Sequence, residues 1–358
     1  MLTLTQLLEK AHTLRASDVH LVCGLPPKCR IDGAVTDLTE DTLTAADCEL
    51  FPFALAIARE LAGDGYEAMA SIGELDMART FPGIARTRVN LFRQQGCVSA
   101  AIRLLSDHIP SLEALSLPPA VADFAAYRSG IVLVTGETGS GKSTTLAALL
   151  DRINHTRPGH IITLEDPIEY IYTPDRCVIN QREIGTDTRS YADGLRAILR
   201  EDPDVILIGE MRDLNTIETA LTAAETGHLV FATLHTNSAA DAIDRMVNVF
   251  PDGQQAQIRL QLSTTLRAVL SQQLLPKRAS AGRIAACEIM VVTDAIRNLI
   301  REAKTPQINS FITMDSRSGS VTMDQSLRRL VQDRVVSFDT ALSYARDREA
   351  FRSAAQPY

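Results

Sequence analysis

The sequence predicts an α/β protein in two parts, with a parallel-rich sheet in the C-terminal part and a smaller α+β domain before it. From about residue 120 onward, short apolar segments alternate with helical stretches, which is typical of parallel strands joined by right-handed crossovers. Residues 1–106 instead hold short alternating segments and a hairpin signal. A length of 358 residues accommodates about two domains of roughly 150 residues each.

The N-terminal domain is predicted to span residues 1–106. Its expected elements are a helix (4–14), a strand (19–23), a hairpin (29–35) and two strands (87–92 and 98–104). Leu4 to Leu14 carry apolar residues at helical spacing, whereas the later segments alternate as half-buried strands do. Asp32-Gly33 is a strong turn signal for the hairpin, and Gly96 separates the last two strands. Three prolines make 107–119 the predicted linker.

The C-terminal domain is predicted to span residues 120–358 and to end in a helical subregion. Its expected strands are 131–134, 161–164, 205–208 and 229–234. Asp213 and Gly227 have the residue types of a helix N-cap and C-cap around the helix between them. Ser238, with Asp241 three residues later, predicts a capping box for the helix that follows.

One loop predicts nucleotide binding. Residues 136–143 match the pattern GxxxxGK[ST], between an apolar strand and a helical stretch. Such a loop points backbone N–H groups and a helix N-terminus at one anion. We expect Lys142 to reach the β- and γ-phosphates and Ser143 to ligate Mg²⁺. The predicted ATP-binding residues are Gly136, Glu137, Thr138, Gly139, Ser140, Gly141, Lys142, Ser143 and Thr144.

Polar residues follow three of the predicted strands. Ligands of parallel sheets bind at the carboxyl ends of the strands, so these positions are candidates for chemistry. We interpret Glu210 as the water-positioning base, because its strand is expected to lie beside the strand of the phosphate loop. Glu165 is the second acidic candidate, acting through Mg²⁺ or through the water. His235 could sense the γ-phosphate or bind a neighbouring subunit.

Three other polar residues near these strands have no assigned role. Asp166 could cap the turn after its strand, and Glu169 could be an ordinary solvated carboxylate. His228 follows Gly227 and could have a functional role like that of His235, although its position favours this less.

Composition narrows the class of protein. A net charge of -8 argues against nucleic-acid binding as the main activity, since such binding depends on clustered Lys and Arg. No window approaches the ~20 apolar residues of a membrane span, and the N-terminus has no signal-peptide pattern, so we expect a cytosolic protein. None of the six cysteines forms a CxxC pair, so reduced thiols are expected rather than a zinc site.

Motifs in this order resemble those of the secretion ATPase superfamily, which powers type II secretion and type IV pili. They are the phosphate loop, the acidic box 164–170, the run 202–213 and the histidine segment 226–236. Residues 295–302, AIRNLIRE, resemble a signature of the pilus-retraction branch. Residues 16–27 resemble the start of the N-domain of that branch, and the paired-cysteine insertion of extension ATPases is missing. The chain departs from the family at Glu137, where many relatives have Pro.

The resemblance implies a RecA-like ATPase domain, a PAS-like N-domain and a homohexameric ring that hydrolyses ATP with Mg²⁺. Arg88 and Arg103 match N-domain arginines that reach the phosphates, with Arg86 and Arg93 as rivals. The implied function is type IV pilus retraction, which underlies twitching motility and DNA uptake, at the inner face of the cytoplasmic membrane. The implied partners are an inner-membrane pilus platform protein and an assembly or accessory retraction ATPase, with no direct nucleic-acid contact.

Two alternatives remain at the level of sequence. One is a related ATPase that serves accessory retraction, secretion or DNA uptake. The other is a nucleotide-binding regulator that does not hydrolyse, against which the presence of Glu165, Glu210 and His235 argues.

Overall fold

The computed structural model describes residues 3–31, 33–40, 42, 73–95, 97–105, 108–280 and 282–354. It divides into two compact units. The first comprises residues 1–108 with 167–171, and the second comprises 109–166 with 172–358. The predicted turn residues Asp32 and Gly96, the cysteine Cys48 and the start of the predicted linker at 107 lie outside the described residues.

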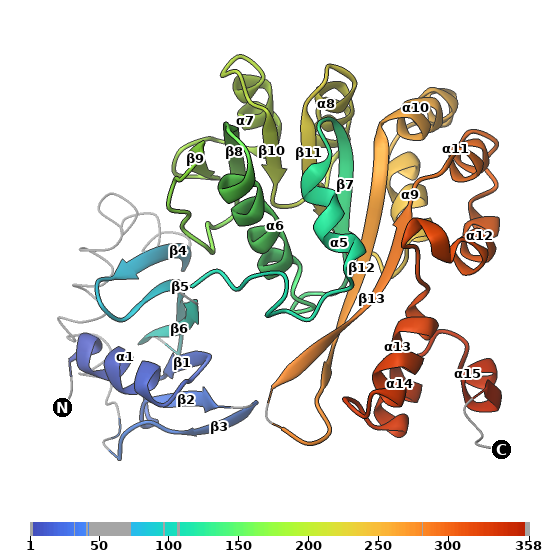
Figure 1. The fold of residues 1–358 in the computed structure, drawn as a ribbon. Helices are drawn as coiled ribbons and strands as arrows, with labels where there is room; N and C mark the ends of the chain where they lie inside the picture. The colour runs from blue at the N-terminus through green and yellow to red at the C-terminus, as the bar shows by residue number, and fades with distance from the viewer. Residues whose placement is uncertain are drawn as a thin grey trace. The chain divides into compact units, whose positions relative to one another are not determined.

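The first unit is an antiparallel sheet with a helix, α1 (Leu4–Thr13), as Figure 1 shows in blue and cyan. The strand order is β3-β2-β1-β6-β5-β4. Its strands are β1 (Asp18–Leu21), β2 (Lys28–Ile31), β3 (Ala34–Asp37), β4 (Glu74–Phe81), β5 (Ala85–Gln94) and β6 (Cys97–Leu105). The predicted helix, hairpin strands and last two strands are present. The first strand ends at Leu21, before Cys23, and β4 was not predicted.

The core of the first unit forms between α1 and the sheet. Thr3 and Gln6 form a reciprocal capping box that fixes the start of α1. Leu7 and Leu8 are almost fully buried, as expected for the apolar face of this amphipathic helix. Val89 of β5 is buried on the sheet side of the same core. Because side chains alternate along a strand, Arg88 and Asn90, its neighbours in β5, lie on the opposite face of the sheet.

The second unit contains a sheet in the order β13-β12-β7-β11-β10-β8-β9. Its strands are β7 (Gly130–Thr135), β8 (Gly159–Glu165), β9 (Cys177–Glu183), β10 (Val205–Ile208), β11 (Leu229–Leu234), β12 (Leu266–Pro276) and β13 (Arg283–Val291). All neighbouring pairs are parallel except β12 and β13, which form a long antiparallel hairpin. This confirms the predicted α/β class with a mostly parallel sheet. The edge strand β9 and the hairpin were not anticipated.

One expectation about this sheet is wrong. The strand before Glu210, β10, does not lie beside β7, because β11 is inserted between them: β11 pairs with β7 on one side and with β10 on the other. All six residues of β11 are buried, as suits the most central position. The apolar run of β10 is equally compatible with any interior position, so composition could not fix the order.

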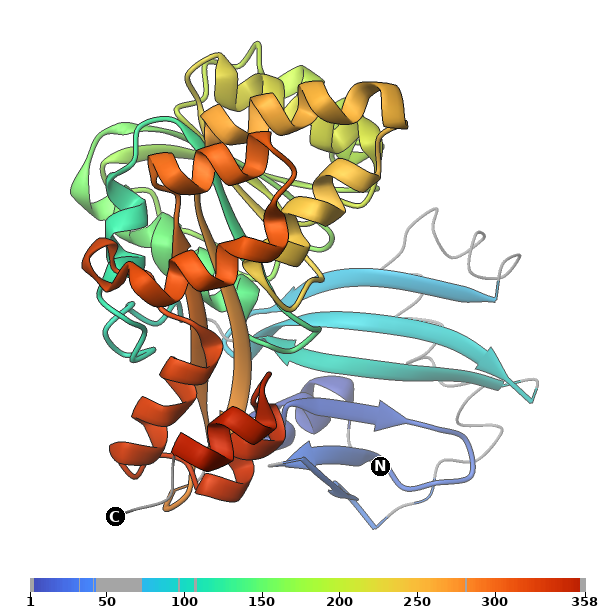
Figure 2. The same cartoon turned by 90° about the vertical axis from the view of Figure 1, so that its right-hand side faces the viewer.

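Helices cover both faces of this sheet (Figures 1 and 2). Those longer than four residues are α6 (Lys142–Thr156), α7 (Tyr191–Ile198), α8 (Leu214–Glu225), α9 (Ala239–Asn248), α10 (Asp252–Thr265), α11 (Asp294–Arg301), α12 (Ile308–Met314), α13 (Met323–Gln332), α14 (Phe338–Tyr344) and α15 (Arg348–Ala354). Helix α13 packs on β13 and α14 on β12, which forms a small second core around Leu275, Leu327 and Phe351. No helix among the described residues is long and apolar enough to cross a membrane.

Helix ends follow the sequence signals closely. Asp213 caps α8 by accepting a hydrogen bond from the Thr216 N–H, and Gly227 follows the helix with a φ of +105°. Ser238 caps α9 through the Asp241 N–H, but the reciprocal bond that would complete the predicted capping box is not formed.

Candidate nucleotide site

The phosphate loop joins β7 to α6, as the sequence predicts. Gly136 has a φ of +142°, and a Cβ there would lie 2.4 Å from the Gln272 carbonyl oxygen, so only glycine fits. Gly141 has a φ of +92° and precedes the first residue of α6. The Lys142 ammonium donates to the carbonyls of Gly136 (2.8 Å) and Glu137 (2.9 Å). The lysine thus lies along the inside of the loop, where a bound phosphate would compete for the same charge.

The floor of the loop is built from β12. The hydroxyls of Thr135 and Ser271 lie 2.8 Å apart, and both are buried. The Gln272 amide donates to the hydroxyl of Thr145 in the first turn of α6 (3.0 Å). Within the loop, the Ser140 hydroxyl is buried and has no hydrogen-bond partner among the described residues. An unsatisfied buried hydroxyl is costly, so it is available to an incoming phosphate oxygen.

Glu210 lies between a histidine and an arginine at the carboxyl edge of the sheet. Its Oε1 lies 3.2 Å from His235 Nε2, and its Oε2 lies 2.7 Å from Arg212 Nη2. Burial alone would raise the pKa of Glu210, but the Arg212 hydrogen bond and the nearby His235 outweigh it, so the pKa lies below its ordinary value. The carboxylate is therefore ionised throughout the neutral range.

Glu165 ends β8, the next strand along the same edge. Its Oε1 accepts a hydrogen bond from the Thr163 hydroxyl at 2.6 Å and faces the Gln181 amide at 3.4 Å. The backbone N–H of Gly209 donates to the Leu164 carbonyl at 2.8 Å, which holds the two strand ends together. Glu165 and Glu210 therefore follow adjacent strands at the same edge.

Tyr191 packs beside the two strand ends that carry Glu165 and Glu210. Burial raises the pKa of its phenol, and the charges of Asp166, Glu210 and Glu165 raise it further. A Cβ on Gly209 would lie 2.9 Å from the Tyr191 hydroxyl oxygen, so the ring packs directly against the strand end before Glu210.

The sheet order brings most of the predicted site residues together. The phosphate loop follows β7, His235 follows β11, Glu210 follows Gly209 at the end of β10, and Glu165 ends β8, on four neighbouring parallel strands. His228 lies elsewhere: its Nδ1 is 2.9 Å from the Ala223 carbonyl and 3.1 Å from the Thr226 hydroxyl, so it serves the end of α8. Glu169 belongs to the short segment 167–171 grouped with the first unit.

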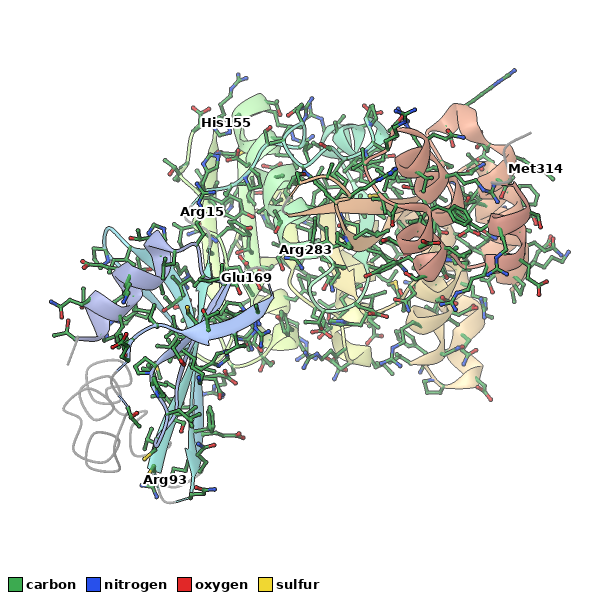
Figure 3. All side chains as sticks on the ribbon, turned by 90° about the horizontal axis from the view of Figure 1, so that it is seen from below. Arg15, Arg93, His155, Glu169, Arg283 and Met314 are labelled. Carbon is green, nitrogen blue, oxygen red and sulfur yellow. The ribbon has the colours of Figure 1, made fainter. Side chains whose placement is uncertain are left out.

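The predicted arginines of the first unit form a pair. Arg88 on β5 and Arg103 on β6 are direct cross-strand partners. Arg103 also pairs with Asp18 on β1, at 2.9 Å. Of the rivals, Arg86 donates to the Ile168 carbonyl at 2.7 Å, and Arg93 lies at the far end of β5, at the tip of the sheet (Figure 3).

Four contributors were not assigned roles from the sequence. Arg212 is two residues from Glu210, a spacing that could have been noticed, since alternate residues of an extended segment share a face. Tyr191, Ser271 and Gln272 carry no local signal, because they approach the site only through tertiary packing. No group of three or more metal-ligating His, Cys, Asp or Glu side chains occurs in the described ranges.

Comparisons with known proteins agree with this geometry. The chain is 44% identical over 348 residues to the type IV pilus retraction ATPase PilT of Pseudomonas aeruginosa, covering 97% of this chain and 99% of that protein. It is 36% identical over 329 residues to the type IV pilus ATPase PilU of the same organism, covering 92% and 85%. A crystal structure of the pilus retraction motor PilT with bound ADP matches with a TM-score of 0.90 and 45% identity, over 99% of this chain and all of that one.

The sequence pattern of one protein family covers most of the chain. It is described as "Type II/IV secretion system protein" and matches residues 84–343, which include the phosphate loop, both glutamates and His235. The chain therefore belongs to the family of type II/IV secretion system proteins.

Proposed function

We propose that this protein is an ATPase that powers the retraction of type IV pili. One observation carries the proposal: a phosphate loop, two carboxylates and a histidine gather at the carboxyl edge of one sheet in a chain that matches the full length of a retraction ATPase. Phosphoryl transfer requires positioning and charge stabilisation more than covalent chemistry, and these groups supply both.

The residues at the loop suit Mg²⁺. Ser143 stands in the first turn of α6, and carboxylate and hydroxyl oxygens are the ligands that Mg²⁺ prefers. Ser143 would hold the ion, with Glu165 near it directly or through water. When bound, the ion neutralises charge on the phosphates. Lys142 would bind the β- and γ-phosphates, and Glu210 would orient the attacking water while His235 contacts Glu210.

The finer architecture is also part of the proposal. The second unit is taken as a RecA-like domain (120–358), the first as a PAS-like domain (1–106), and 107–119 as the linker. The active assembly is a homohexamer that binds ATP and Mg²⁺. Arg88 and Arg103 supply positive charge to the phosphates. The position of Arg88 supports this, because it lies opposite Arg103 and, unlike Arg103, has no ion pair with any described residue.

We place the motor at the inner face of the cytoplasmic membrane. Its partners there are an inner-membrane pilus platform protein and an assembly or accessory retraction ATPase. No nucleic-acid contact is proposed, in keeping with the net charge of -8.

Deletion of the gene tests the cellular role. A cell crowded with surface pili that cannot move by twitching is the expected result, because fibres would be built but not withdrawn. A cell without pili would mean that this ATPase builds the fibre, and normal pili with lost secretion would favour the related secretion ATPase. The 44% identity to the type IV pilus retraction ATPase PilT, over 97% of this chain, supports the retraction role.

Two matched variants test the chemistry. Glu210→Gln and Glu165→Gln each remove one carboxylate charge while keeping the side-chain volume. We expect Glu210→Gln to bind ATP normally and to lose phosphate release, and Glu165→Gln to need more Mg²⁺ for half-maximal rate. If only Glu165→Gln abolishes turnover at saturating Mg²⁺, the two roles are exchanged. If the unmodified protein binds ATP but releases no phosphate, the protein is a nucleotide-binding regulator.

A further inference from the structure

An ion pair between a buried carboxylate and a partly exposed arginine connects the C-terminal helices to the sheet beside the nucleotide site. Glu288 lies in the middle of β13, and its side chain is 1% exposed. Its Oε2 lies 2.8 Å from Nη1 of Arg346, which stands between α14 and α15. Burial raises the pKa of Glu288 despite the attraction of Arg346. Acidic side chains are almost never fully buried unless they are paired, and Arg346 provides the partner here.

The pair fixes the segment that follows His235. Arg346 Nη2 donates to the Asn237 carbonyl oxygen, while the Ala239 N–H donates to Glu288 Oε1 at 2.9 Å. Residues 237–239 are thus bound on both sides by the two members of one ion pair. Arg346 is itself held by its own backbone, since its N–H donates to Asp324 Oδ1 at 2.9 Å.

The same pair lies level with the phosphate loop across the sheet. Glu288 is the direct partner of Ser271 on β12, Ser271 is level with Thr135 on β7, and Thr135 with Leu234 on β11. Gly136 of the loop follows Thr135, and His235 follows Leu234. One transverse row of the sheet therefore joins the ion pair to both segments.

We propose that Arg346 is a positioning residue for ATP hydrolysis. With Glu288 it holds residues 237–239, and this keeps His235 against Glu210, at the 3.2 Å contact described above. The C-terminal helices therefore control the hydrolysis step without touching the nucleotide. The inference rests on the proposed roles of His235 and Glu210.

The test compares Arg346→Gln with Arg346→Lys and with the control Arg348→Gln. Arg348 belongs to the same C-terminal region and donates to the Ser343 carbonyl at 3.0 Å, so its substitution removes an equal charge away from the loop. The measured quantities are kcat, KM for ATP, the dissociation constant of ADP and the unfolding midpoint of the full chain.

We expect Arg346→Gln to lower kcat between about 10- and 100-fold, because small displacements of reacting groups cost that much. ADP affinity stays at the wild-type value, and Arg348→Gln is active. The unfolding midpoint of Arg346→Gln falls, because Glu288 is left buried without its partner, so kcat is compared at a temperature where both variants are folded. Arg346→Lys falls between, since an ammonium cannot serve two acceptors with the fixed fork of a guanidinium. In a His235→Ala background, Arg346→Gln adds no further loss of kcat, because the side chain that Arg346 positions is already absent.

Unchanged kcat in Arg346→Gln overturns the proposal, and so does a loss of ADP affinity that parallels the loss of kcat. If the kcat losses of Arg346→Gln and His235→Ala add fully in the double variant, Arg346 does not act through His235. Wild-type turnover by His235→Ala alone overturns the assigned role of His235 itself, which separates failure of the proposed site from failure of this inference.

Discussion

Arg88 and Arg103 lie directly opposite each other on β5 and β6, with Asp18 opposite Arg103 on its other side. Opposite side chains on an antiparallel pair have Cβ atoms about 4.5–5.5 Å apart, so two guanidinium groups share one patch of the sheet. Asp18 binds Arg103, whereas Arg88 has no ion pair with any residue in the described part of the chain. The row Asp18–Arg103–Arg88 therefore retains one uncompensated positive charge.

Replacing Arg88 by Ala is expected to lower kcat strongly. Arginines that stabilise the transition state of phosphoryl transfer are worth about 10³- to 10⁵-fold in rate. The control is Arg93→Ala, which removes an arginine from the same strand at its far end, and which should keep wild-type turnover. Steady-state phosphate release measures both. Equal losses in the two variants would contradict a specific role of Arg88.

Replacing Lys142 by Ala is expected to weaken ATP and ADP binding and to abolish turnover. Hydrogen bonds from a charged donor contribute about 1.5–3 kcal/mol each, which corresponds to roughly a 10- to 150-fold loss of affinity per bond. Titration calorimetry measures the affinity, with Lys304→Ala as a control, since Lys304 pairs with Glu302 away from the loop at 2.7 Å. Tight ADP binding by Lys142→Ala would contradict the assignment of the phosphate loop.

Replacing Arg212 by Gln should move the acidic limb of the rate profile to higher pH. Arg212 helps to hold the pKa of Glu210 below its ordinary value. Removal of its charge and hydrogen bond raises that pKa, so the carboxylate becomes protonated, and kcat falls, at a higher pH than in the wild type. Because the arginine side chain is 75% exposed, added salt should shrink the difference. Superimposable profiles at low salt would show that Glu210 does not limit the rate.

Replacing Gly209 by Ala should destabilise the protein, and Tyr191→Phe should partly restore it. The added Cβ would lie 2.9 Å from the Tyr191 hydroxyl oxygen and 3.1 Å from the Leu164 carbonyl oxygen. Overpacking of this kind costs about 1–3 kcal/mol. Removing the hydroxyl relieves the nearer contact and leaves the other. Urea unfolding of the two single variants and the double variant measures the coupling, and strictly additive losses would contradict the packing described here.

The residues of the site that follow strand ends could be predicted from the sequence, but the residues that support them from other elements could not. The phosphate loop, Glu165, Glu210 and His235 could be placed at strand ends because parallel sheets bind ligands there. The order of β10 and β11 could not be inferred, because both strands are uniformly apolar. Ser271 and Gln272 lie in a strand whose pairing with β7 is set by contacts distant in sequence.

The ion pair of Glu288 and Arg346 could not be predicted from the sequence for a different reason. Glu288 stands in an otherwise apolar strand, and this could have marked it as unusual. Nothing near Arg346 in the sequence identifies its partner, since 58 residues separate the two positions in the chain. Local patterns predict elements, and the long-range pairing of charges depends on how those elements pack.

The length of β12 has a mechanical consequence. The strand has 11 residues, or about 36 Å at the usual rise of roughly 3.3 Å per residue. It contributes Ser271 and Gln272 to the floor of the phosphate loop, and beyond Ser271 it runs on beside β13 to the small core that α13 and α14 complete. An extended backbone is already close to its greatest length and cannot be stretched further. β12 is therefore a nearly inextensible connection between the small C-terminal core and the floor of the phosphate loop.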